Sequence, residues 1–181
     1  MDTGSATYVF IAGIHNSGPE HWQAIWYGRT ADGVWVAHSS WDDPVRDVWV
    51  KELDDALAAI EGPKVLIAHS LGCAVVTEWA SERRDDSIAG AFLVAMPDVH
   101  GPNFPTTALG FGSPRYARPA FPTVVVASED DPYGSLQHSA AVAERLGARL
   151  VNVGRKGHLN AESGIGDWPE GWSVFSEQFA R

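Results

Sequence analysis

The sequence predicts an α/β fold built on a six-stranded parallel sheet with helices on both faces, and two patterns support this prediction. Short apolar runs rich in β-branched residues are typical of buried strands. Six such runs occur, at residues 8–12, 34–38, 64–68, 91–95, 123–127 and 149–153. Helix-like segments separate them, and strands that alternate with helices form parallel sheets. We expect one domain over residues 1–181, because this length suits a single core.

The helices are predicted from their start signals. Ser17 and Glu20 have the spacing of a capping box, which predicts that a helix opens there. Asp43 is a good N-cap and Pro44 suits a first helical turn, so a second helix is expected from this pair. Further helices are expected from residue 71 toward 83, from about 136 to 146, and from 167 to the C-terminus.

One segment interrupts the alternation of strands and helices. Residues 97–122 include six prolines and three glycines, which predicts a long loop. Loops of this length in a compact domain usually serve function. We expect this loop to cover a pocket and to select the acyl group that enters it, with Phe104 and Phe111 as its apolar side chains. The alternative is that these two aromatics only anchor the loop to the core.

Charge and composition exclude several partners. The chain has 23 acidic and 13 basic residues, and a net charge of −10 repels nucleic acid. No apolar stretch approaches the roughly 20 residues that span a bilayer, and the first residues lack a signal-peptide pattern, so we expect no membrane partner and a cytoplasmic location. The single cysteine, Cys73, and the lack of zinc-like Cys/His spacing fit a reducing compartment and a site without metal or cofactor.

Ser70 is the candidate nucleophile. It follows the apolar run at residues 64–68 and precedes a segment of small residues that begins a helix. Ala68 and Gly72, two positions on either side, supply the small neighbours that a sharp strand-to-helix turn needs, as in the G-x-S-x-G elbow. The alternative is that Ser70 only caps the helix, since serine is a common N-cap.

A base and an acid follow in the order that such an elbow requires. His158 is the one histidine of seven that follows the last predicted strand, in a glycine-flanked loop, and it is our candidate base. Asp131 is the candidate acid, because Pro132 favours an extended backbone before it. Asp130 is the second choice, and Asp98 is a third because it also follows a strand.

The loop after the first strand should carry the second oxyanion amide. We assign the two backbone donors to Ile14, in this loop, and to Leu71, at the start of the helix after the nucleophile. The substrate pocket is expected to include His15, His69 and Phe104. An exposed loop position is an equally good interpretation of His15.

These motifs together resemble a family of small serine hydrolases, which includes bacterial YdeN and the retinoblastoma-binding serine hydrolase of animals. The resemblance extends along the chain and rests on residues 13–26, 68–73, 128–133, 157–164 and 168–171. The most specific of these is the segment 157–164, Gly-His-Leu-Asn-Ala-Glu-Ser-Gly, followed by Trp-Pro-Glu-Gly at 168–171.

The resemblance implies an α/β-hydrolase fold without a large cap domain and a strand order of 2-1-3-4-5-6. It also implies catalytic roles for Ser70, Asp131 and His158. We expect hydrolysis of carboxylic esters with small or medium acyl chains through an acyl-enzyme on Ser70. Alternatives are an amidase, peptidase or acyltransferase that uses the same three residues, and a binding module that keeps the fold with little turnover. The expected partner is a small-molecule ester or amide.

Overall fold

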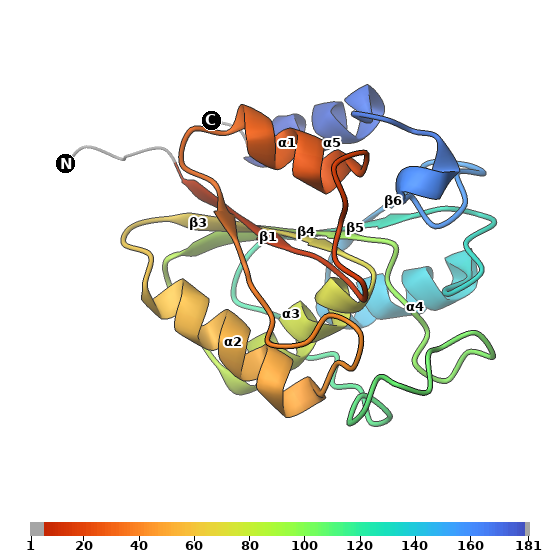
Figure 1. Ribbon diagram of the computed structural model, residues 1–181, viewed down its shortest axis with the longest axis horizontal. Coiled ribbons are helices and arrows are strands. Elements are labelled where there is room, and N and C mark those ends of the chain that lie inside the picture. Colours follow the sequence, from red (N-terminus) through yellow and green to blue (C-terminus); the bar gives the residue numbers. More distant parts are fainter. Residues whose placement is uncertain (1–5, 180–181) are drawn as a thin grey trace.

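The computed structural model describes residues 6–179 as a three-layer α/β structure (Figure 1). The central sheet has six parallel strands in the order β2-β1-β3-β4-β5-β6. The strands are β1 Thr7–Ile11, β2 Val34–Trp35, β3 Lys64–His69, β4 Ile88–Val94, β5 Thr123–Ala127 and β6 Arg149–Asn152. This order and the six parallel strands confirm the predicted fold class.

Five α-helices cover both faces of the sheet. They are α1 Trp22–Arg29, α2 Arg46–Ala58, α3 Leu71–Glu82, α4 Leu136–Leu146 and α5 Pro169–Phe179, with a 3₁₀ helix, η1, at Ala161–Ser163. In Figure 1, α1 and α5 lie above the sheet, whereas α2, α3 and α4 lie below it. No helix within residues 6–179 is long and apolar enough to cross a membrane.

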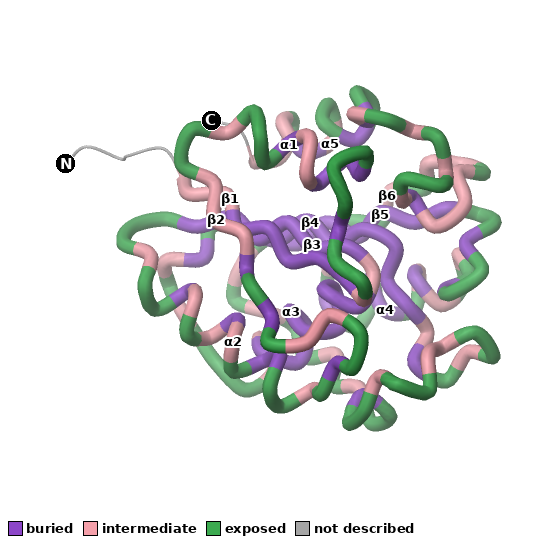
Figure 2. The backbone as a smooth tube through the Cα atoms, in the orientation of Figure 1, coloured by how far each residue is buried: buried purple, intermediate pink, exposed green. Residues whose placement is uncertain are grey.

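The sheet separates two apolar cores. One packs α2, α3 and α4 against one face, and the other packs α1 and α5 against the opposite face. Figure 2 shows the central strands buried along most of their length. Strands covered on both faces lack the polar alternation of half-exposed sheets, which explains the continuous apolar runs in the sequence. All six positions of β3 are buried, and β3 leads directly to Ser70.

The predicted start of the first helix is wrong. The helix begins at Trp22, and its N-cap is His21, whose Nδ1 accepts a hydrogen bond from the Gln23 amide at 3.1 Å. Ser17 instead donates its hydroxyl to the Gln23 side chain at 2.8 Å. That side chain is buried and donates to backbone carbonyls of β1 and β3. The serine is thus used in a tertiary contact, which a local capping rule does not detect.

The predicted start of the second helix is also wrong by a few residues. The helix begins at Arg46, and the residue before it, Val45, is extended and gives no side-chain cap. Val45 forms a parallel bridge with Leu109 of the long loop. Leu109 donates its amide to the carbonyl of Pro44, and its own carbonyl accepts from the amide of Arg46, both at 2.9 Å. This pairing keeps the Asp43-Pro44 segment out of the helix.

The remaining differences concern element ends. The strand expected at 34–38 is only Val34–Trp35, although the amide of Val36 still bonds to β1. The strand expected at 91–95 begins earlier, at Ile88. Residues 97–122 form the long loop that the sequence predicts, with no helix or extended strand.

Candidate active site

Ser70 lies in a sharp turn between β3 and α3. Its backbone has φ 54° and ψ −124°, a strained conformation for a residue with a side chain, and its hydroxyl makes no hydrogen bond to the helix. A Cβ at Gly72 would collide with the carbonyl oxygens of Ile11 and Ala12, so α3 can approach β1 this closely only with glycine there. The hydroxyl is therefore held above the strand ends rather than used as a cap.

The structure brings Ser70, His158 and Asp131 together. The Ser70 hydroxyl lies 2.8 Å from Nε2 of His158, and Nδ1 of His158 lies 2.8 and 2.9 Å from the two Asp131 oxygens. A carboxylate only accepts, so Nδ1 carries the proton and Nε2 is free to accept from the serine. The side chain of Asp131 is 2% exposed and that of His158 is 11% exposed, so water competes weakly for these hydrogen bonds.

The other two candidate acids lie elsewhere. Asp130 accepts from the amide of Gly157 at 2.8 Å and from the hydroxyl of Ser128 at 3.0 Å. The hydrogen bond from Gly157 holds the pKa of Asp130 below its ordinary value. Asp98 accepts from the amide of His100 within its own turn. Of the three acids, only Asp131 contacts the imidazole of His158.

The two candidate oxyanion amides lie at the ends of β1 and β3. Leu71 is the first residue of α3, where backbone amides have no partner within the helix. Neighbouring amides of the loop after β1 already have hydrogen-bond partners. The amide of His15 donates to the carbonyl of Trp41, and the amide of Asn16 donates to the carbonyl of Gly13. A Cβ at Gly13 would lie 3.0 Å from Cβ of Ser70, which shows how closely this loop approaches the turn.

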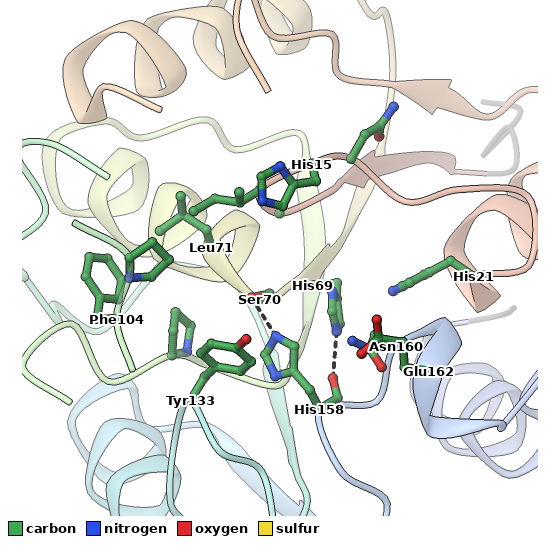
Figure 3. Close-up of a pocket in the computed structure, with 15 residues that line it drawn as sticks. His15, His21, His69, Ser70, Leu71, Phe104, Tyr133, His158, Asn160 and Glu162 are labelled. Carbon is green, nitrogen blue, oxygen red and sulfur yellow. Dashed lines mark hydrogen bonds between the residues drawn. The ribbon is translucent and has the colours of Figure 1, made fainter. Parts of the chain in front are cut away.

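A pocket of about 280 Å³ opens over Ser70 and His158 (Figure 3). All three residues expected to line it do so. His15 is exposed and bonds to Asp42 at 2.8 Å. His69 is buried and bonds through Nε2 to the backbone oxygen of His158 at 2.9 Å, whereas Phe104 comes from the long loop.

Several residues that line this pocket were not predicted from the sequence. His21, Tyr133, Asn160 and Glu162 also line it. Asn160 and Glu162 belong to the segment 157–164, which the resemblance marked as specific, so a signal for them was present. The ring of Tyr133 lies 4.5 Å from that of His158, centre to centre, and partly covers it.

The histidines around the base are held neutral. Burial, assisted by the charge of His158, lowers the pKa of His21 to about 4. Burial also lowers the pKa of His69 well below its ordinary value. Near neutral pH these rings therefore add no positive charge next to His158. Within residues 6–179, no group of three His, Cys, Asp or Glu side chains could hold a metal ion.

Several solved structures have a similar fold. A YdeN-like hydrolase from Pectobacterium atrosepticum has a TM-score of 0.85 at 28% identity, covering 97% of this chain and 91% of that one. The ydeN gene product of B. subtilis has a TM-score of 0.81 at 21% identity, covering 98% and 100%. The esterase RhEst1 from Rhodococcus shares the fold at 13% identity, with a TM-score of 0.68 and coverage of 98% and 91%.

A search of curated proteins found no match. A family model described as serine hydrolase matches residues 8–177, which is nearly the whole chain. The match covers the turn at Ser70, the loop that carries His158, five complete strands and β1 from its second residue. The neighbours have the same α/β-hydrolase fold, and no cap domain interrupts it within residues 6–179. The chain therefore belongs to the serine hydrolase family.

Proposed function

We propose that the protein hydrolyses carboxylic esters of small or medium acyl chains through an acyl-enzyme on Ser70. One observation carries this proposal, the unbroken line of hydrogen bonds from the Ser70 hydroxyl through His158 to Asp131. A serine hydroxyl is a weak nucleophile until a base takes its proton, and an imidazole with a fixed tautomer is such a base.

The proposed reaction has two halves. Ser70 Oγ attacks the ester carbonyl while its proton passes to Nε2 of His158, and the amides of Ile14 and Leu71 receive the negative charge that develops on the carbonyl oxygen. The carbon–oxygen bond to the alcohol then breaks, and His158 returns the proton to the departing oxygen. A water molecule, deprotonated by the same imidazole, then attacks the acyl carbon; the bond to Ser70 Oγ breaks, His158 returns the proton to Oγ, and the acid is released. Asp131 holds the imidazole throughout.

The pocket supports a substrate of limited size. Its volume of about 280 Å³ is at the lower end for small-molecule sites, which favours short acyl chains. Loop residues Pro97, Phe104 and Pro105 line one side and supply apolar surface for an acyl group. We also propose a cytoplasmic location, because the single cysteine, Cys73, is buried as a free thiol.

The test compares native protein with Ser70→Ala. We expect native protein to be labelled by a fluorophosphonate probe and to turn over p-nitrophenyl acetate. The variant should lose labelling and fall in turnover by on the order of 10⁶, because the nucleophile is absent. If native protein is not labelled by the probe and does not hydrolyse p-nitrophenyl acetate, a binding module would be favoured instead. A panel of acyl, amide and thioester substrates separates ester hydrolysis from amidase, peptidase and acyltransferase activity.

A further inference from the structure

The pocket has two chemically different sides. In Figure 3, Leu71, Phe104 and Tyr133 lie on one side of Ser70, and the side chains there are mainly apolar. Asn160 and Glu162 lie on the other side, beyond His69. The proposed reaction uses the serine between the two sides, but it assigns no role to Asn160 or Glu162.

Hydrogen bonds fix the orientation of the Asn160 amide. Its Oδ1 accepts from the backbone amide and from the hydroxyl of Ser163, both at 3.1 Å. A backbone N–H can only donate, so the atom that faces it is the oxygen, and the amide cannot be flipped. The Nδ2 group therefore points away from Ser163, and it has no hydrogen-bond partner within residues 6–179. Asn160 offers the pocket a fixed donor.

Glu162 offers a complementary acceptor. It is exposed, and within residues 6–179 its carboxylate makes no ion pair or hydrogen bond. Burial keeps His21 and His69 neutral by lowering the pKa of each ring, and no lysine or arginine lines the pocket. Glu162 is therefore the one formal charge on this side of the described pocket near neutral pH, and it is negative.

A donor beside a carboxylate selects among polar groups. A substrate carboxylate would be repelled by Glu162, and an ammonium group could not accept from Asn160 Nδ2. A hydroxyl satisfies both residues, because it accepts from the amide while it donates to the carboxylate. The chemistry thus matches a hydroxylated group.

We propose that Asn160 and Glu162 bind a hydroxyl on the alcohol portion of the ester, so that preferred substrates join an apolar acyl group to a hydroxylated alcohol such as glycerol. This inference rests on the proposed ester hydrolysis. The alcohol portion is assigned to this side because the opposite side is apolar and suits the acyl group, and because His158, which lies between the two sides in Figure 3, must return a proton to the departing oxygen. The acyl group then occupies the apolar side.

The test compares three butyrate esters: glycerol 1-monobutyrate, propyl butyrate and butyrylcholine. For native protein, we expect kcat/KM to be about tenfold or more higher for the glycerol ester than for the propyl ester. Glu162→Gln, which replaces a charge-assisted hydrogen bond by a weaker neutral one, and Asn160→Asp, which removes the donor, should each reduce this ratio about fivefold to tenfold. Asn160→Asp retains an oxygen for Ser163, removes the donor and adds a negative charge to the pocket. Glu144→Gln, an exposed change on α4, should leave the ratio unchanged.

The outcomes distinguish this inference from the function on which it rests. Equal kcat/KM for the glycerol and propyl esters, or a preference for butyrylcholine, would overturn the hydroxyl site and leave ester hydrolysis standing. A ratio that neither variant changes would also overturn it. Turnover of none of the three esters would overturn the inference together with the proposed function. Thermal melting of each variant checks that it is folded, and Glu162→Gln, at an exposed position, provides the test if Asn160→Asp is not.

Discussion

Two adjacent acids have different partners, although their side chains are chemically identical. Asp131 bonds to the imidazole of His158, and the amide of Tyr133 donates to it at 2.9 Å. Asp130 accepts from Gly157, one residue before His158, and so holds the loop that carries this histidine. We infer that Asp131 orients the imidazole directly, whereas Asp130 acts on it through the backbone.

This difference predicts unequal effects of two matched substitutions. Asp131→Asn should reduce kcat for p-nitrophenyl acetate by on the order of 10⁴, because the amide favours the wrong tautomer of His158. Asp130→Asn should have a much smaller effect, since an amide oxygen can still accept from Gly157. Steady-state kinetics give kcat for native protein and for both variants, and so measure the difference between them. If Asp130→Asn were the more damaging change, our choice of acid would be wrong.

At the scale of elements, the site depends on a close contact between α3 and the end of β1. Gly72, in the first turn of α3, lies against backbone carbonyls of β1 that a Cβ would strike. The α1 helix adds a second connection, because Trp22 donates its indole N–H to the carbonyl of Leu159 at 2.9 Å. These contacts set the distance between the turn that holds Ser70 and the loop that holds His158.

Gly72→Ala should therefore damage both stability and turnover. The added methyl group meets backbone rather than a movable side chain, so we expect a loss of roughly 1–3 kcal/mol of unfolding free energy. Gly28→Ala, in α1, is the control: nothing lies within 4 Å of the added Cβ. It should stabilise the protein by about 0.5–1 kcal/mol through helix propensity. Urea denaturation measures the unfolding free energy of both variants, and equal values would contradict the close contact between α3 and β1.

At the scale of the whole molecule, burial of neutral histidines links stability to pH. Burial lowers the pKa of His21, His38 and His69, so all three resist protonation in the folded state. In the unfolded chain each would return to its ordinary pKa. The unfolded state therefore binds more protons in mildly acidic solution, and stability must fall as the pH is lowered.

The expected window follows from His21, whose pKa falls from 6.5 to about 4. Its stabilising contribution is present above about pH 6.5 and is lost as the pH falls toward 4. At pH 5 this single residue should cost on the order of 2 kcal/mol relative to pH 8. Urea denaturation followed by tryptophan fluorescence at the two pH values measures the loss. His21→Asn retains a capping side chain that does not titrate, so this variant should lose less unfolding free energy than native protein between pH 8 and pH 5. Equal losses in native protein and variant would refute the role of His21.

Much of the architecture follows from local pattern. The strands are buried on both faces, so their apolar runs are visible in the sequence, and five of the six strands span most of the predicted residues. The turn at Ser70 was also predictable, because small residues on either side mark its sharp geometry. Only His158 follows the last predicted strand, and this position restricted the candidate base to it.

Other features were decided by tertiary contacts that local pattern does not encode. The first helix starts at Trp22 because Ser17 bonds to a buried glutamine, and the second starts at Arg46 because the long loop pairs with the residues before it. The choice between Asp130 and Asp131 depended on which side chain reaches the imidazole, a distance set by the packing of β5 and β6. Local sequence thus determined the helices and strands and the order of the reactive residues along the chain. Only the folded chain decided where helices begin and which polar groups share the pocket, because those outcomes depend on contacts between distant segments.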